Sequence, residues 1–507
     1  MSKLSKNILY NLLGQGLLIV LSFVAVKFIF KKLGQDALGI IYFTFTLNAL
    51  LTALLALGIN ETTVREVAAF HEEDPAYIRR LLQTASFFYW SLYLLAAVAL
   101  YESAPWLVTK WINLDTLSPS TATTVLRLLG IATLLALPRS FCASILRGIQ
   151  RMEITNLIDV AAGALQQFGA IVVLVLGGGL IQVTLWIAGC YLLGLVIYLS
   201  VCARFFGGSA FLPAISASVI DRNARFTFGL AKITVLSMIH MQSDKAIVSK
   251  LLPLGVFGYY GMAYNGVSRG MLVTSSVSQA VFPSFSALYK QGDRDGLLRQ
   301  YRKVQDLLCY AIVPLFAAIP FAARPLFTFV LNAQAARMLF WPVTFLSIGF
   351  FMSGTSTIPY VFSLAVGKPE IAARTTYYAL FVVLPVTTLL VYRFGIAGAG
   401  FSWIFYHLFA YAYMMPLVCS ECLDMPVWEW YLHIFRVFGL AALTYGGAVT
   451  IMIYFGSFSI SWLISAYIIG SCAFAGAGYR LIGNELRETL RRVIFLKPAP
   501  ASTSPLT

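Results

Sequence analysis

The sequence predicts an all-α protein that crosses a membrane about 14 times, and three observations support that prediction. Of the 507 residues, 59% are hydrophobic and only 11% are charged, whereas soluble domains are about 45–50% apolar and about 25% charged. The mean hydropathy is +0.80. Apolar stretches of the roughly 20 residues that cross a bilayer recur along almost the whole chain. They are apolar on every side, which excludes a transmembrane β-barrel, because barrel strands alternate apolar and polar residues.

Charged or Gly/Pro-rich breaks separate the apolar stretches into fourteen predicted spans. In chain order, the predicted limits are 8–30, 37–60, 81–101, 122–146, 154–176, 180–203, 226–250, 255–288, 305–323, 339–364, 371–392, 397–419, 432–455 and 459–480. The first stretch is too long for the apolar part of a cleaved signal peptide, so we predict that it remains as the first span. The eighth is longer than a bilayer requires and is predicted to continue into the cytoplasm as an amphipathic end.

A weak internal repeat, at an offset of 219 residues, groups spans 1–6 and spans 7–12 into two similar units. Its clearest matches are glycines near loops or span ends, namely Gly39 with Gly258, Gly148 with Gly367 and Gly179 with Gly398. Six is an even number of spans, so both units have the same orientation, which predicts a pseudo-two-fold axis along the membrane normal. The predicted domains are an N-terminal six-helix lobe (1–204), a C-terminal six-helix lobe (225–420), two additional helices (432–480) and a disordered tail (497–507).

The positive charges predict how the chain is oriented. The formal net charge is +15, but the Lys and Arg residues lie in short loops and form no basic patch, so no nucleic-acid partner is expected. With the N-terminus inside, 22 of these residues fall in loops and tails on the cytoplasmic side and seven on the opposite side. Cytoplasmic loops carry an excess of Lys and Arg. The bias predicts a multi-pass protein with both termini in the cytoplasm.

Sequence patterns of common enzymes are missing. The chain contains no GxxxxGK[ST] or HExxH pattern, so neither a phosphate-binding loop nor a zinc-peptidase site is indicated. Its four histidines are dispersed, and Cys419 and Cys422 have CxxC spacing without a second pair. The longest predicted outer loop, near Glu102–Thr121, is short for a catalytic region. We therefore predict a transporter with no catalytic residues, no metal and no cofactor.

Charged residues inside the predicted spans are the candidate site. A charge at the bilayer centre costs roughly 2.5–3.5 kcal/mol on insertion scales and tends to face a cavity. The deep cations are Arg139, Lys232, Lys245 and Arg269, and the polar groups beside them are Asp159, Asp244 and His240. The excess is positive, which predicts a central cationic cavity for an anionic ligand, with arginine able to bind a diphosphate in a bidentate manner.

A structural interpretation of the same residues stays open. Asp244 can form an ion pair with Lys245 or Lys232 that only holds spans together, and Asp159 can do the same for Arg139. His240 is either a packed polar residue or a proton carrier that couples transport to a gradient.

Several segments resemble a known family. They are KKLGQDALGIIYF (31–43), LGINETTVREVA (57–68), LRGIQRMEITN (146–156), SDKAIVSKLLPLGVFGYYGMAY (243–264) and VFPSFSALYKQGD (281–293). In order and spacing they resemble the polysaccharide transporters, which include the flippases of O-antigen and other lipid-linked oligosaccharides. The same superfamily holds multidrug exporters, whose acidic ion site is not recognisable in this chain.

The resemblance implies a function. A member would move a polyprenyl-diphosphate-linked oligosaccharide, such as an O-antigen, capsule or exopolysaccharide repeat unit, from the cytoplasmic to the outer leaflet of a bacterial inner membrane by alternating access. Its partners would be that lipid-linked oligosaccharide, membrane lipid and a downstream polymerase or ligase.

Two other functions stay open. A cation-coupled multidrug antiporter shares the architecture, but a cationic cavity repels cationic drugs. A membrane-embedded polysaccharide polymerase or glycosyltransferase is less favoured, because exposed catalytic loops are missing.

Overall fold

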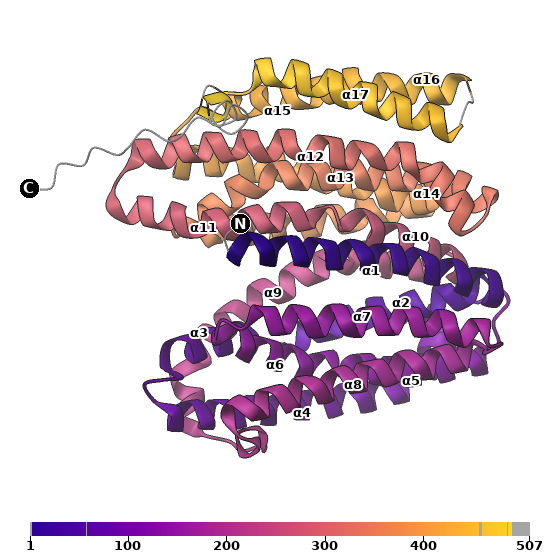
Figure 1. Cartoon of the computed structure of the whole chain (residues 1–507), viewed down its shortest axis with the longest axis vertical. Coiled ribbons are helices and arrows are strands. Elements are labelled where there is room, and N and C mark those ends of the chain that lie inside the picture. The colour runs from indigo at the N-terminus through magenta and orange to yellow at the C-terminus, as the bar shows by residue number, and fades with distance from the viewer. Residues whose placement is uncertain (1–2, 57, 456–458, 484, 489–507) are drawn as a thin grey trace, which may run out of the picture. The chain divides into compact units, whose positions relative to one another are not determined.

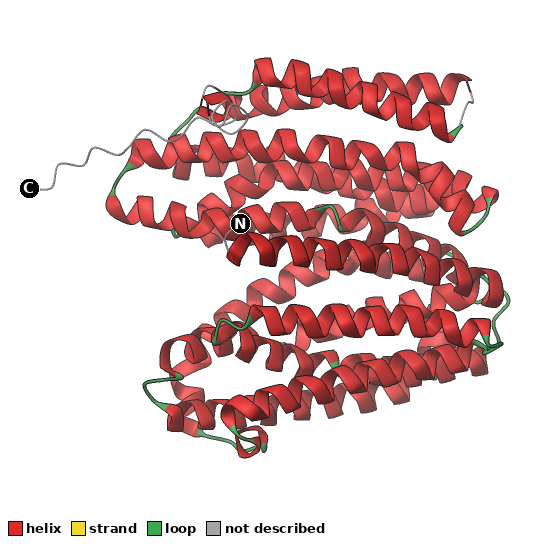
Figure 2. Ribbon diagram, viewed as in Figure 1, coloured by secondary structure: helices red, strands yellow, loops and turns green. Residues whose placement is uncertain are grey.

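The computed structural model is helical throughout the residues that it describes, which are 3–56, 58–455, 459–483 and 485–488 (Figures 1 and 2). Within them, extended pairing is limited to one isolated bridge between Asn113 and Pro253. The tail predicted at 497–507 lies outside the described residues. The predicted all-α class is confirmed.

The chain forms two compact units. The first consists of the chain up to Met262 together with Phe329–Ala335 and Thr387–Ala399. The second consists of Ala263–Thr328, Ala336–Val386 and the chain from Gly400 onward. The lobes predicted at 1–204 and 225–420 and the two additional helices at 432–480 stay a prediction.

Helices of the first unit follow one another with short connections. Their bounds are α1 (Lys3–Leu33), α2 (Gln35–Leu55), α3 (Ile59–Phe70), α4 (Pro75–Trp106), α5 (Pro119–Leu134), α6 (Ala136–Gly148), α7 (Met152–Val175), α8 (Leu180–Phe206) and α9 (Ala217–Leu251), with α10 (Leu254–Ser268) beginning in this unit. Within it, α1 packs on α7, α7 on α8, α5 on α8, and α9 on α2 (Figure 1).

Most of the remaining helices lie in the second unit. They are α11 (Met271–Gln291), α12 (Arg294–Val330), α13 (Ala333–Ala365), α14 (Pro369–Val418), α15 (Val427–Ala441), α16 (Gly447–Phe455) and α17 (Ile460–Leu481), and short π-helical turns at Cys419–Leu423 and Ala442–Gly446 extend α14 and α15. The end of α12, the start of α13 and the middle of α14 belong to the first unit. Helix α14 is broken at Gly395, whose φ of 58° and ψ of −139° are not helical. This break separates the spans predicted at 371–392 and 397–419.

Ten helical stretches among the described residues are long and apolar enough to cross a membrane. The stretch Pro369–Leu423 counts as one of them although it contains the break at Gly395. Helix α9, which covers the predicted span 226–250, is not among the ten, and polar residues such as His240, Asp244 and Lys245 interrupt it. A polytopic membrane protein is confirmed, and the total of fourteen spans stays a prediction.

Large apolar side chains on the helix surfaces agree with a lipid environment. Leu176 at the end of α7 and Leu443 near α15 are each 81% exposed, and Leu94 on α4 is 59% exposed. Water-soluble monomers rarely expose such residues in contiguous patches. In a bilayer these side chains contact lipid chains, while residues such as Leu82 and Leu126 form the buried interior of the first unit.

Two helices begin with the same cap at positions 219 residues apart. The Asp74 carboxylate accepts a hydrogen bond from the Tyr77 backbone N–H (2.8 Å) at the start of α4, and Asp293 accepts one from the Gly296 N–H (2.9 Å) at the start of α12. Such caps satisfy donors that the first helical turn leaves unpaired. The coincidence supports the predicted internal repeat.

Helices α2 and α10 cross at a pair of glycines. A Cβ atom added to Gly258 would lie 2.7 Å from the Gly39 nitrogen and 2.8 Å from its Cα, so the two backbones touch. The rings of Phe43 and Phe257 pack edge to face beside them, with centroids 6.1 Å apart. Gly39 and Gly258 are also a matched pair of the predicted repeat.

Candidate functional site

Arg139 lies near the start of α6, beside a break in the predicted span 122–146. That span is divided into α5 and α6 at Leu135, and Pro138 follows within the first turn of α6. A proline in the first turn removes only a backbone donor that is unpaired there anyway.

The Arg139 guanidinium forms an ion pair within the first unit that joins α6 to α7. Its Nη2 lies 2.5 Å from Asp159 Oδ1 on α7, and the Tyr198 hydroxyl on α8 donates to the same oxygen (2.9 Å). A Cβ added to Gly194 would be 3.3 Å from Arg139 Nη1, so this glycine leaves room for the guanidinium. The side chains of Arg139 and Asp159 remain 21% and 47% exposed. The pair is therefore accessible, and the arginine has further N–H donors beyond the one that Asp159 accepts.

The Asp244–Lys245 pair is enclosed, in contrast. Lys245 Nζ donates to Asp244 Oδ1 (3.1 Å) and to the Met241 carbonyl (2.8 Å), and both charged side chains are 5% exposed. The Tyr260 hydroxyl on α10 donates to Asp244 Oδ2 (2.5 Å). This cluster joins α9 to the first half of α10, as the structural interpretation of Asp244 requires.

The other predicted residues are distributed over both units. His240 lies one helical turn before Asp244 and is partly buried. Lys232 is in α9, but its side chain lies outside the described residues. Arg269 follows α10 in the second unit and is exposed together with Asn265, one turn earlier. Asn265 and Arg269 thus share one face, as their spacing predicts.

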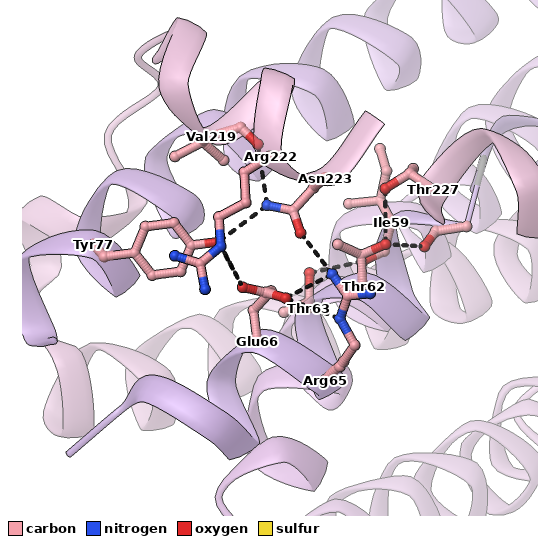
Figure 3. A network of polar contacts seen from close by, with 11 residues as sticks. Ile59, Thr62, Thr63, Arg65, Glu66, Tyr77, Val219, Arg222, Asn223 and Thr227 are labelled. Atoms are coloured by element: carbon pink, nitrogen blue, oxygen red, sulfur yellow. Dashed lines mark hydrogen bonds and ion pairs between the residues drawn. The ribbon is translucent and has the colours of Figure 1, made fainter. Parts of the chain in front are cut away.

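A polar network around Glu66 joins α3, α4 and α9 (Figure 3). The Glu66 carboxylate is 3% exposed. Arg65 Nη2 lies 2.6 Å from Oε1, while the Tyr77 hydroxyl donates to Oε2 (2.7 Å) and Arg222 Nε lies 3.5 Å from it. Two guanidinium groups thus surround one buried carboxylate, and the Glu66 network keeps one net positive charge.

Asn223 completes the Glu66 network from α9. Its side-chain amide donates to the Tyr77 hydroxyl (3.0 Å), and its carbonyl oxygen accepts from Arg65 Nη2 (2.9 Å). Thr62 and Thr227 form a further hydrogen bond between α3 and α9 (2.8 Å). The start of α9 is therefore held to α3 and α4 by side chains that are distant in sequence.

Sequence patterns alone do not predict the Glu66 network. Arg65 and Arg222 are two of the cations expected on the cytoplasmic side, and Arg65 also lies in the segment 57–68 that resembles the family. A signal was nevertheless present, because Glu66 is an acid beside Arg65 on a helix whose neighbours Thr63 and Val67 are buried.

An apolar cavity of about 380 Å³ lies in the second unit between α12, α13 and α15–α16. Phe316, Trp341, Phe351 and Phe438 contribute to its walls, and Ser347 is one of its few polar residues. Such a lining favours a hydrocarbon ligand over a sugar.

Metal binding receives no support from the side chains that the structure describes. Among them, no three His, Cys, Asp or Glu residues are grouped so that they could hold an ion.

The chain is similar in sequence to a known protein family and to a transporter. Residues 4–289 match the family model described as "Polysaccharide biosynthesis protein". A candidate O-antigen transporter of Shigella flexneri is 20% identical over 406 residues, which cover 78% of this chain and 93% of that protein.

Solved structures share the fold. The lipid II flippase MurJ in an inward closed conformation has a TM-score of 0.70 and 12% identity, and the match covers 96% of this chain and all of that one. An inward-facing multidrug resistance MATE transporter has a TM-score of 0.66 and 14% identity, covering 80% and 94% of the two chains. The chain therefore shares its fold with these two proteins.

The family match spans more than half of the chain. The protein therefore belongs to the polysaccharide biosynthesis protein family, which confirms the resemblance noted in its motifs.

Proposed function

We propose that the protein is a flippase that moves a polyprenyl-diphosphate-linked oligosaccharide from the cytoplasmic to the outer leaflet of the bacterial inner membrane. The observation that carries this proposal is family membership combined with a transporter fold. Biosynthesis of a surface polysaccharide requires its building blocks on the outer side of the membrane. The chain belongs to a polysaccharide biosynthesis family and has the architecture of a transporter. We expect no catalytic activity from it.

Arg139 is the first residue that we propose for substrate contact. It is an arginine within a membrane-spanning segment that keeps 21% of its side chain exposed. A diphosphate that approaches Arg139 can replace the Asp159 carboxylate or bind beside it. Both groups accept hydrogen bonds from the same planar guanidinium. Arg269 and Lys232 are proposed as further contacts.

Lys245 is proposed to act indirectly. Its ammonium is enclosed with Asp244, and their mutual attraction offsets the cost of burying both charges. It would fix the position of α9 rather than touch the substrate, and Asp244 shares this role. His240, beside them, is proposed as a packed polar residue.

Transport would follow alternating access, with two six-helix lobes moving about a central site. The apolar cavity between α12, α13 and α15–α16 has the chemistry to accept part of a polyprenyl chain while the rest stays in the bilayer. A polymerase or ligase would then use the sugar, and both termini would face the cytoplasm.

The proposed function is tested by lipid extraction from cells with and without the gene. We expect the deletion strain to accumulate a polyprenyl-diphosphate oligosaccharide and to lose surface glycan. Unchanged lipid-linked sugars, together with increased sensitivity to cationic dyes, would overturn the flippase proposal and favour a multidrug antiporter.

The role of Arg139 is tested by complementation of that strain. We expect Arg139→Ala to abolish surface glycan and Arg139→Lys to retain part of it, since lysine keeps the charge but not the bidentate geometry. If the arginine only neutralises Asp159, the double variant R139A/D159N would restore export, and the proposed substrate contact would be wrong.

A further inference from the structure

Another cavity, which has a more polar lining, lies in the first unit. It is at the helix ends that join the predicted cytoplasmic loops. Its volume is about 1030 Å³, and residues at the start of α4, between α6 and α7, and at the end of α8 line it. Three of the lining residues are arginines, namely Arg79, Arg80 and Arg151. We refer to it as the arginine cavity.

The arginine cavity has more positive than negative charge. Arg79 and Arg80 are exposed, and among the described residues neither has a carboxylate within 4.0 Å. Arg151 lies 3.4 Å from Glu153, with both side chains about half exposed. Glu72 is the acidic residue of the lining, and its side chain is 87% exposed. The guanidinium groups are therefore available to an external anion.

Apolar side chains also line the arginine cavity. Phe205 and Phe206, at the end of α8, line the cavity together with Ile149, and Phe205 is 47% exposed. Arg151 is held in this lining by the turn after α6, where Gln150 has a φ of 59° and the Arg151 N–H donates to the Leu146 carbonyl (2.8 Å). A ligand that fits this cavity carries an anionic group next to hydrocarbon.

The second unit contains a smaller cavity whose lining includes the carboxylates Glu421 and Asp424, each in an ion pair with a basic residue. It has a volume of about 370 Å³ and lies where α11, α12 and the turn after α14 meet. Arg294 Nη2 is 2.5 Å from Asp424 Oδ2. Lys368 Nζ is 3.2 Å from Glu421 Oε2. The protein itself supplies the anions for these basic groups.

The predicted repeat relates the two cavities. At the offset of 219 residues, the acids of the second unit correspond to other residues in the first. Glu370, Glu421 and Asp424 are replaced by Arg151, Cys202 and Phe205 respectively. The first unit thus has the larger cavity, and its lining has no carboxylate at the positions that correspond to Glu421 and Asp424.

We propose that the arginine cavity binds the headgroup of an anionic phospholipid from the cytoplasmic leaflet. Basic pockets between membrane-spanning helices on this side are suited to such headgroups. The phosphate contacts Arg79, Arg80 and Arg151, and the acyl chains leave along Phe205 and Phe206. A water-soluble acidic partner would make no use of these two phenylalanines. This proposal does not depend on which substrate the protein transports.

The test is native mass spectrometry of the purified full-length protein, released from micelles that contain phosphatidylglycerol or phosphatidylcholine. We expect R79Q/R80Q to lower the affinity for phosphatidylglycerol about tenfold or more, since each basic residue near anionic lipid contributes about 1 kcal/mol. The matched control R294Q/K368Q removes two cations that have internal partners and should retain phosphatidylglycerol like the unmodified protein. Phosphatidylcholine binding should be the same in all of them.

Two further measurements make the test decisive. The charge-preserving variant R79K/R80K should restore phosphatidylglycerol binding, which separates loss of charge from misfolding. Equal retention of phosphatidylglycerol by R79Q/R80Q would overturn the proposal. Inorganic phosphate that displaces phosphatidylglycerol at equal concentration would also overturn it, because the cavity would then be a site for a soluble anion.

Discussion

Replacing Glu66 by glutamine tests whether the Glu66 network holds α9 in place. The substitution keeps the size of the side chain and removes the one negative charge between Arg65 and Arg222. Glutamine replaces one of the two carboxylate oxygens with an NH2 donor, so it cannot accept from Arg65 at Oε1 (2.6 Å) and from Tyr77 at Oε2 (2.7 Å) as the carboxylate does. The two guanidinium groups then lose the carboxylate that lies within 4.0 Å of both.

The size of the effect follows from the exposure of the partners. Breaking a fully buried ion pair costs about 3–5 kcal/mol. Here the carboxylate is buried but the side chains of Arg65 and Arg222 are 41% and 46% exposed, so water continues to solvate them. Hydrogen bonds to charged groups contribute about 1.5–3 kcal/mol, and we expect Glu66→Gln to destabilise the protein by about 2 kcal/mol.

The assay is thermal unfolding of the purified protein in detergent. Glu66→Gln should lower the melting temperature, and Glu72→Gln, an exposed acid near the same end of the unit, should leave it unchanged. A double-mutant cycle with Asn223→Ala should show coupling, because Asn223 contacts Tyr77 and Arg65. A melting temperature unaffected by Glu66→Gln would refute the view that this carboxylate organises the network.

Two more predictions concern helix contacts inside the first unit. Gly258→Ala places a methyl group 2.7 Å from the Gly39 nitrogen and should destabilise the protein by about 1–3 kcal/mol through overpacking. The control in the same unfolding assay is Gly189→Ala, where a Cβ meets no atom within 4 Å. Equal melting temperatures of the two variants would contradict the close crossing. Lys245→Met removes the cation that pairs with the buried Asp244 and should destabilise the protein by about 3–5 kcal/mol. The double variant D244N/K245M should recover most of that stability. An equally unstable double variant would show that the loss of this ion pair is not the cause.

The class of protein could be predicted from composition, because long apolar segments leave few alternatives to membrane-spanning helices. Individual pairs were harder. The sequence offered Asp159 as a partner for Arg139 and Asp244 as a partner for Lys245 without deciding between a structural and a binding role, and the structure brings both pairs together.

The Glu66 network lay beyond sequence reasoning for a physical reason. Glu66 and Arg222 are far apart in the chain, and their contact depends on how α9 packs against α3 and α4. Helical periodicity identifies residues on one face of one helix, but it does not identify which other helix meets that face. The arginine cavity escapes prediction for the same reason, because Arg79 lies in α4 whereas Arg151 lies between α6 and α7.

The crossing of Gly39 and Gly258 bears on how the chain arose. If the repeat reflects duplication of a gene for a six-span protein, that ancestor would have paired with a second copy of itself, and one glycine would have met its own image across the dimer axis. Any side chain at that position would then have entered the crossing twice. In the fused chain the two glycines are separate residues, so each can change alone, and the first alanine brings one methyl group into the contact instead of two.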